Sequence, residues 1–109
     1  MILLARDAVR CRFMEVNLCV LLWAHEGHDA ALSAYEDQVL SWLGEHDGKI
    51  IQRARSVAGD ESEPTEVQLL WFASEAALDG FMNDTRRAAL AEQREKAIAM
   101  TGVMRVQLL

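Results

Sequence analysis

The sequence predicts a single α+β domain with the element order β-α-β-β-α-β. Segments 16–24 and 66–72 have the composition and spacing of strands, and apolar residues recur at helical spacing from Leu32 onwards. The only proline, Pro64, lies in a polar loop between two strand candidates. This order is the split β-α-β, or ferredoxin-like, arrangement, in which helices cover one face of a four-stranded antiparallel sheet.

The first strand is expected over Val16–Ala24, which is apolar on both alternating faces and therefore typical of a covered, central strand. The helix that follows should turn one stripe toward the sheet, made of Leu32, Tyr35, Val39, Trp42 or Leu43, and His46. Its solvent face should carry Glu36, Asp37 and Glu45. Gly48 can end this helix in the left-handed conformation.

The second strand is expected over Lys49–Val57 and the third over Glu66–Phe72, an antiparallel pair around the loop AGDESEP. Ser74 with Glu75 should cap a short helix, and Asn83 or Asp84 a longer one that runs to Met100. Gly102 would end that helix, and 103–109 would form the fourth strand. The first and third strands, the most apolar, should lie in the middle of the sheet.

Composition limits the classes of function. The chain has 109 residues, enough for one domain with a real core, and 51% of them are hydrophobic. Its net charge of −6 disfavours nucleic acid and anionic membranes as partners. Cys11 and Cys19 are too few for a disulfide scaffold, and no apolar stretch has the length of a signal or a membrane span, so we expect free thiols in a cytoplasmic protein.

Apolar residues on both faces of the strands have a further consequence. Helices can cover only one face of this sheet, so the other face would remain open in a monomer. An open apolar face of this kind is typical of an interface. The sequence therefore predicts a homodimer in which sheet packs against sheet.

Several short motifs recur in a known superfamily. They are Tyr35–Glu36, Gly48, Arg53, Phe72–Ala73, the stretch Ser74–Phe81, and Asp84–Arg87. Over about residues 16–109 the chain resembles the dimeric α+β barrel superfamily, and more narrowly a small bacterial family related to the antibiotic-biosynthesis monooxygenases. The resemblance implies a homodimeric ferredoxin-like barrel over 14–109. Residues 1–13 fall outside the match, and we expect them to form an N-terminal arm that packs on the partner subunit.

The resemblance selects no single activity. The superfamily includes cofactor-free oxygenases, small isomerases, lactone-forming enzymes, haem proteins and ligand-sensing modules, and no residue set in this chain singles out one of them. The usual HGG-like turn is His46-Asp47-Gly48 in this sequence.

The segment His25-Glu26-Gly27-His28-Asp29 is the densest group of ligand-type side chains. His25 or His28 could supply a base near neutral pH or contact a substrate, and the group could hold zinc or iron. Equally, the segment could be a polar loop whose His28 or Asp29 caps the next helix. We predict no metal site from it.

Aromatic and basic residues offer a second set of candidates. Tyr35, Trp42 and His46 are either core residues or one wall of a pocket between helix and sheet, which Trp23 and Trp71 would complete. Superfamily relatives commonly bind ligands in that position, which supports the pocket.

Arg53 and Arg55 lie two residues apart on a predicted strand. Each would pair with a carboxylate of this or the partner subunit, or anchor the carboxylate or enolate of a substrate.

No GxGxxG motif, P-loop, nucleophilic-serine elbow or CxxC motif occurs, which disfavours nucleotide cofactors, phosphoryl transfer, serine-triad hydrolysis and thiol redox chemistry. The resemblance implies a small-molecule pocket used by a cofactor-independent oxygenase, isomerase or cyclase, and an apolar, aromatic wall would suit an aromatic or polyketide-like substrate. His25, His28 or Tyr35 would assist proton removal and Arg53 would steady the oxyanion. The alternative is a non-catalytic ligand-sensing or interaction domain. A closed pocket containing a titrating His or Tyr would favour the enzyme, and a filled core with an external patch would favour the alternative.

Overall fold

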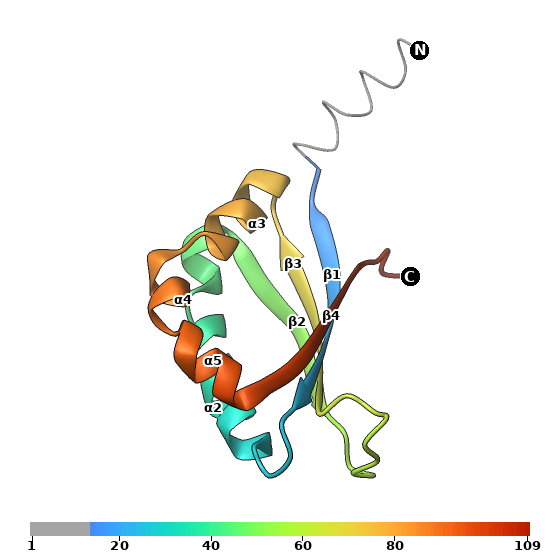
Figure 1. The fold of residues 1–109 in the computed structure, drawn as a ribbon. Coiled ribbons are helices and arrows are strands. Elements are labelled where there is room, and N and C mark those ends of the chain that lie inside the picture. The colour runs from blue at the N-terminus through green and yellow to red at the C-terminus, as the bar shows by residue number, and fades with distance from the viewer. Residues whose placement is uncertain (1–13) are drawn as a thin grey trace, which may run out of the picture.

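The computed structural model describes residues 14–109, which form one antiparallel sheet with helices packed against it (Figure 1). In chain order the elements are β1 (Val16–Ala24), α2 (Asp29–Leu40), the 3-10 helix η1 (Leu43–His46), β2 (Gly48–Arg55), β3 (Glu66–Phe72), α3 (Glu75–Met82), α4 (Thr85–Ala89), α5 (Ala91–Ala97) and β4 (Ile98–Arg105). This arrangement confirms the predicted α+β, ferredoxin-like fold. The predicted N-terminal arm, 1–13, lies outside the described residues.

The two most apolar strands lie in the middle of the sheet, as expected. The strand order is β2-β3-β1-β4, and every neighbouring pair is antiparallel. Leu18 pairs with Leu70 of β3 and, on the other side, with Arg105 of β4. The bounds of β1 and β3 match the predicted segments.

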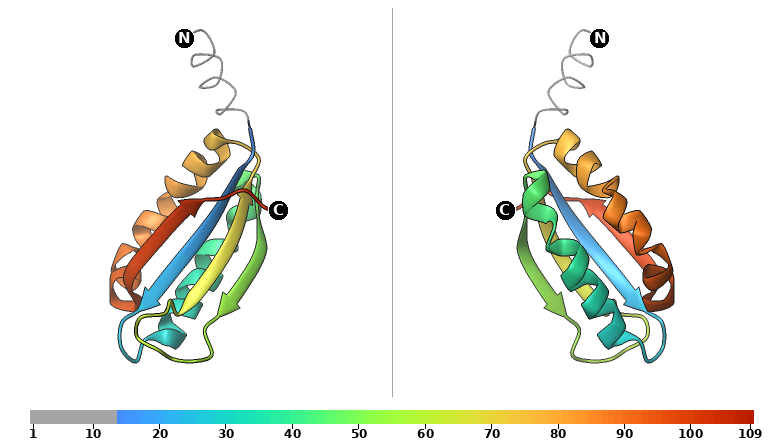
Figure 2. Two further views of the ribbon diagram at one scale, coloured as in Figure 1. Left: turned by 90° about the vertical axis from the view of Figure 1, so that its right-hand side faces the viewer. Right: turned by 90° about the vertical axis from the view of Figure 1, so that its left-hand side faces the viewer.

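All the helices lie on one side of the sheet (Figure 2). Burial alternates along β1, where Val16, Leu18, Val20 and Leu22 face the helices and are buried. The residues between them, such as Cys19 and Leu21, are only partly buried because they lie on the outer face of the sheet, which no helix of residues 14–109 covers. This outer face is the open apolar face that the sequence predicted.

The turn into β2 differs from the expected one. Asp47, with a φ of 52°, takes the left-handed conformation that was expected of Gly48. Gly48 is needed for a different reason, because a Cβ at this position would lie 2.9 Å from the Phe72 ring and 3.1 Å from Leu43 Cδ2. The absence of a side chain at Gly48 thus allows the first residue of β2 to pack directly against Phe72 and Leu43.

The second helical region ends earlier than predicted. Ser74 accepts a hydrogen bond from the Ala77 backbone N–H, and Asp84 caps α4 in the same way, so both expected caps are present. However, the helical part ends at Ala97, and β4 begins at Ile98 instead of 103. Gly102, expected to end the helix, lies inside β4 opposite Leu21, because pairing with β1 continues to the end of that strand.

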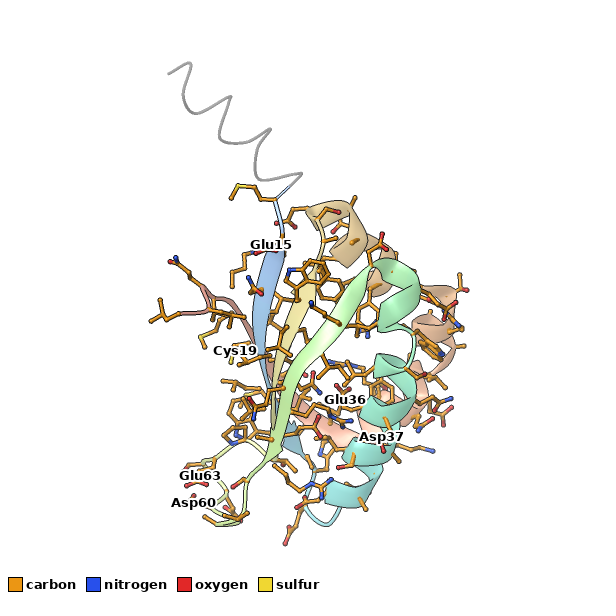
Figure 3. The ribbon with its side chains drawn as sticks, turned by 180° about the vertical axis from the view of Figure 1, so that it is seen from behind. Glu15, Cys19, Glu36, Asp37, Asp60 and Glu63 are labelled. Atoms are coloured by element: carbon orange, nitrogen blue, oxygen red, sulfur yellow. The ribbon has the colours of Figure 1, made fainter. Side chains whose placement is uncertain are left out.

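No helix within residues 14–109 has the length and apolar character needed to cross a membrane. Cys19 is a free thiol on the outer face of the sheet (Figure 3), and Cys11 lies outside the described residues.

We predict that Gly48→Ala lowers the free energy of unfolding by about 1–3 kcal/mol, since its methyl group would be forced against Phe72 and Leu43. Gly44→Ala is the control, because nothing lies within 4 Å of a Cβ there and the φ of Gly44 is not positive. Urea unfolding monitored by circular dichroism measures both. Equal stabilities of the two variants would contradict the close approach.

Candidate functional site

A cavity of about 290 Å³ lies between the helices and the inner face of the sheet. Its volume is near the lower end of the range usual for ligand pockets, about 300–1,000 Å³. Most of its wall is apolar and comes from β1, α2, β3 and α3: Leu18, Val20, Leu22, Val39, Leu40, Leu70, Phe72, Leu78, Phe81 and Met82. The polar residues in its lining are few: Tyr35, Glu36, Gln68, Arg87, Arg94, Thr101 and Arg105.

Tyr35 brings a hydroxyl group into this cavity. Helix α2 carries it on its buried stripe, and only 1% of the residue is exposed. The hydroxyl is buried and has no hydrogen-bond partner among residues 14–109. Burial raises the pKa of this hydroxyl, and the guanidinium of Arg87 opposes the rise. The hydrogen-bonding capacity of this hydroxyl is thus unused among residues 14–109.

Glu36 is buried beside Tyr35, which corrects the expectation that it faces solvent (Figure 3). Its carboxylate accepts a 2.7 Å hydrogen bond from Gln68 Nε2, which also donates at 2.7 Å to Glu66. Burial raises the pKa of Glu36, and the neighbouring charge of Glu66 adds to the rise, while the bond from Gln68 opposes it. A carboxyl group of this kind can exchange a proton with a ligand closer to neutral pH than an exposed one.

Arg53 is the outermost residue of the hydrogen-bonded series that runs from Glu36 through Gln68 to Glu66. Its Nε and Nη2 donate to the two oxygens of Glu66 at 2.8 and 3.0 Å, and its Nη1 donates to Asp37 at 2.7 Å. The hydrogen bonds to Glu66 raise the pKa of the Arg53 guanidinium above its ordinary value. Of the two alternatives for Arg53, the structure shows the ion pair within the chain. Arg55 donates to the Ser33 hydroxyl at 2.6 Å, and neither arginine lines the cavity.

The two histidines of the 25–29 segment lie outside the cavity. Both are exposed, and their rings are 6.3 Å apart in the loop that follows β1. His25 Nε2 is 3.0 Å from the carbonyl oxygen of Glu95, and His28 Nδ1 is 2.9 Å from that of Glu26. His28 is the N-terminal cap residue of α2, but its side chain makes no capping bond. No cluster of potential metal ligands occurs within the part of the chain that the structure describes.

The three tryptophans, expected as pocket walls, also lie outside the cavity lining. Trp23 and Trp71 occupy odd-numbered positions of β1 and β3, and the alternation of the strands places them on the outer face. The Nζ of Lys49 lies 4.8 Å from the centre of the Trp71 ring. Trp42 is partly buried against the core, with the Arg86 guanidinium 4.5 Å from its ring centre.

His46 acts at the junction of η1 and α4. Its Nε2 lies 2.8 Å from Asp84 Oδ2, and Asp84 also binds the Arg86 guanidinium. These contacts, first that of Arg86 and then that of His46, hold the pKa of Asp84 well below its usual range. This group fixes the start of α4 and does not reach the cavity lining.

Six polar cavity residues were not selected from the sequence as site residues: Glu36, Gln68, Arg87, Arg94, Thr101 and Arg105. Glu36 did carry a signal, because it lies four residues after Leu32 and four before Leu40, inside the apolar stripe of the helix. Gln68 lies two residues before Leu70 and therefore on the same, buried face of β3. No sequence pattern placed Arg87 and Arg94 at a cavity, because packing decides how α4 and α5 lie over the sheet.

Fold and site together define a ferredoxin-like α+β domain with an internal cavity. No protein-family model and no curated protein matches the chain.

Solved structures share its fold. One is a protein of unknown function from Rhodopseudomonas palustris, with a TM-score of 0.70 and 17% identity over 98% of this chain and 92% of that one. Another is SnoaB, a cofactor-independent oxygenase from Streptomyces nogalater, with a TM-score of 0.64 and 11% identity over 88% and 96% of the two chains. A dabb family protein from Mesorhizobium loti with a ferredoxin-like fold has a TM-score of 0.63 and 12% identity over 87% and 97%. The fold implied by the sequence resemblance is thereby confirmed.

We predict that Glu36→Gln gains stability relative to the wild type as the pH rises from 5 to 8. The pKa of Glu36 is raised above its ordinary value near 4.5, so the folded state holds the proton more tightly than the unfolded state and loses stability when that proton leaves. The variant has no such proton to lose. Urea unfolding across this pH range measures the difference.

Glu95→Gln, an exposed substitution on α5, is the matched control for this titration. Parallel pH profiles for the two variants would contradict the burial of a titrating carboxyl group at Glu36.

Proposed function

We propose that the cavity binds a small, largely apolar organic molecule, and that the chain is a cofactor-independent enzyme of the oxygenase, isomerase or cyclase kind. The observation that carries the proposal is the buried Tyr35 hydroxyl, which has no hydrogen-bond partner among residues 14–109 and belongs to a residue that lines a largely apolar cavity. A buried polar group without a partner costs stability, and a bound ligand would supply the partner.

The chemistry proposed is proton removal from a carbon next to a carbonyl group. The Glu36 carboxylate takes the proton, the electron pair moves onto the substrate oxygen, and the Tyr35 hydroxyl donates a hydrogen bond to that developing oxyanion. An aromatic or polyketide-like substrate suits the apolar wall. SnoaB, which has the same fold, is a cofactor-independent oxygenase, and this supports the class of reaction.

Within this proposal the other predicted residues have more distant roles. Arg53 acts as a positioning residue, because it reaches Glu36 only through Glu66 and Gln68. His25 and His28 stay predictions as proton-transfer groups, and Trp23, Trp42, Trp71 and Arg55 stay predictions as substrate contacts.

We predict that Tyr35→Phe leaves the melting temperature unchanged or slightly raised, since the lost hydroxyl has no partner within the described fold. The same change should weaken ligand binding by about tenfold, the effect of one hydrogen bond. A thermal-shift screen with aromatic acids and quinones measures both, because a ligand at a hundred times its Kd stabilises by about 2.7 kcal/mol.

Two outcomes would count against this assignment of Tyr35. One is a clear loss of stability in Tyr35→Phe, which would mean that the hydroxyl has a partner within the protein. The other is an unchanged ligand shift in the variant.

A second proposal concerns the outer face of the sheet, an exposed apolar surface of the kind expected of the alternative, a non-catalytic ligand-sensing or interaction domain. The outer face of the sheet is apolar across its central strands and β4, where Met100 is 54% and Met104 is 50% exposed. Its members are Cys19, Leu21, Trp23, Leu69, Trp71, Met100 and Met104. We propose that a second copy of this chain covers this outer face, which would form the homodimeric barrel and allows the enzyme and the binding functions alike.

We predict that light scattering of the wild type at micromolar concentration gives the mass of a dimer, and that Met104→Lys shifts it to a monomer by placing a charge on the outer face. Met82→Lys is the control, because Met82 is equally exposed, at 54%, but lies on α3 on the opposite side of the sheet. A monomeric wild type would overturn the dimer.

A further inference from the structure

The charged residues in the cavity lining have the opposite balance from the chain as a whole. The chain carries 17 acidic and 11 basic side chains, yet the lining has three arginines, Arg87, Arg94 and Arg105, and a single carboxyl group, Glu36. Burying or half-burying guanidinium groups is costly unless an anion compensates them. A surplus of positive charge at this place therefore needs an explanation.

Three other arginines of the described fold form ion pairs with carboxylates: Arg53 with Glu66 and Asp37, Arg86 with Asp84, and Arg105, which also lines the cavity, with Glu75. Arg87 and Arg94 differ, because neither forms an ion pair within residues 14–109, although both are partly buried. The Arg87 guanidinium lies over the Phe81 ring at 4.8 Å, and Arg94 Nη2 donates to the Thr101 hydroxyl at 3.0 Å.

These two arginines line the same cavity as Tyr35, whose hydroxyl has no partner among residues 14–109. Both act electrostatically on the Tyr35 hydroxyl, Arg87 more strongly. Glu36 does not reach either guanidinium within ion-pair distance. Two guanidinium groups and one residue with an unused hydroxyl thus line the cavity, and neither guanidinium has an ion-pair partner among the described residues.

We propose that Arg87, Arg94 and the Tyr35 hydroxyl form an anion-recognition end of the cavity, and that the ligand is an organic carboxylate with a flat apolar body. This inference rests on the proposed function, because it names the class of molecule that the cavity binds. A planar guanidinium matches the two oxygens of a carboxylate, and Tyr35 adds a third donor. The apolar wall from β1 and α3 receives the rest of the molecule.

The test compares two pairs of probes of equal shape and different charge: benzoate with benzamide, and 2-naphthoate with 2-naphthamide, by isothermal titration calorimetry at pH 7.5. The wild type should bind at least one carboxylate about tenfold or more tightly than its amide. Arg87→Gln should lose about ten- to hundredfold in affinity for that carboxylate, the effect of one charged hydrogen bond, and change amide binding less than twofold. The affinity of Arg87→Lys for the carboxylate should lie between those of the wild type and Arg87→Gln, since lysine keeps the charge but loses the paired N–H donors of the guanidinium.

Lys96→Gln is the matched control, because it removes one positive charge from an exposed position of α5 paired only with Glu92. Arg94→Gln is a second test of the anion-recognition end should Arg87→Gln fail to fold. Equal binding of carboxylate and amide, or equal effects of the cavity and control substitutions, would overturn the proposed ligand class and leave the cavity's binding function standing. Binding of no probe from either pair would contradict the proposed function as well.

Discussion

The amide group of Gln68 joins two carboxylates inside the domain, and the polar side of the cavity depends on it. Gln68 is 1% exposed and donates to Glu36 and Glu66 from the same nitrogen, and Arg53 then neutralises Glu66. The contacts tie β3 to α2 on one side and to β2 on the other. Loss of one member would leave a buried charge or donor without a partner, which usually costs several kcal/mol. This network explains how Glu36 can be kept in a largely apolar interior.

The same interior is incompletely filled, and the proposed binding function has a cost in folding stability at this place. Close packing would have placed side-chain atoms in the space that the cavity occupies, with a gain in dispersion energy. Instead, an unpartnered hydroxyl at Tyr35 and two guanidiniums without ion pairs among residues 14–109 face this space. Such groups are retained at a cost in folding free energy. A ligand that satisfies them would return that free energy on binding.

The alternation of side chains along β1 and β3 gives the sheet two different surfaces, an inner one that faces the helices and an outer one that faces away from them. Inward positions of β1 and β3 build the core and the cavity floor, and outward positions such as Leu21 and Trp71 build the outer face. A one-residue slip in register would exchange these two sets, so pairing along the central strands determines both surfaces together. The proposed dimer would then cover the outer face without disturbing the cavity.

Period-two alternation and helix capping act over a few residues, so the fold class, the bounds of β1 and β3, their central position and the helix cap at Ser74 could be predicted from the sequence. Tertiary structure decided the rest. Pairing with β1 placed Gly102 inside β4, and packing against the sheet buried Glu36. Which arginines face the cavity depended on how α4 and α5 lie over the sheet. Such contacts join residues distant in the chain, and no local pattern encodes them.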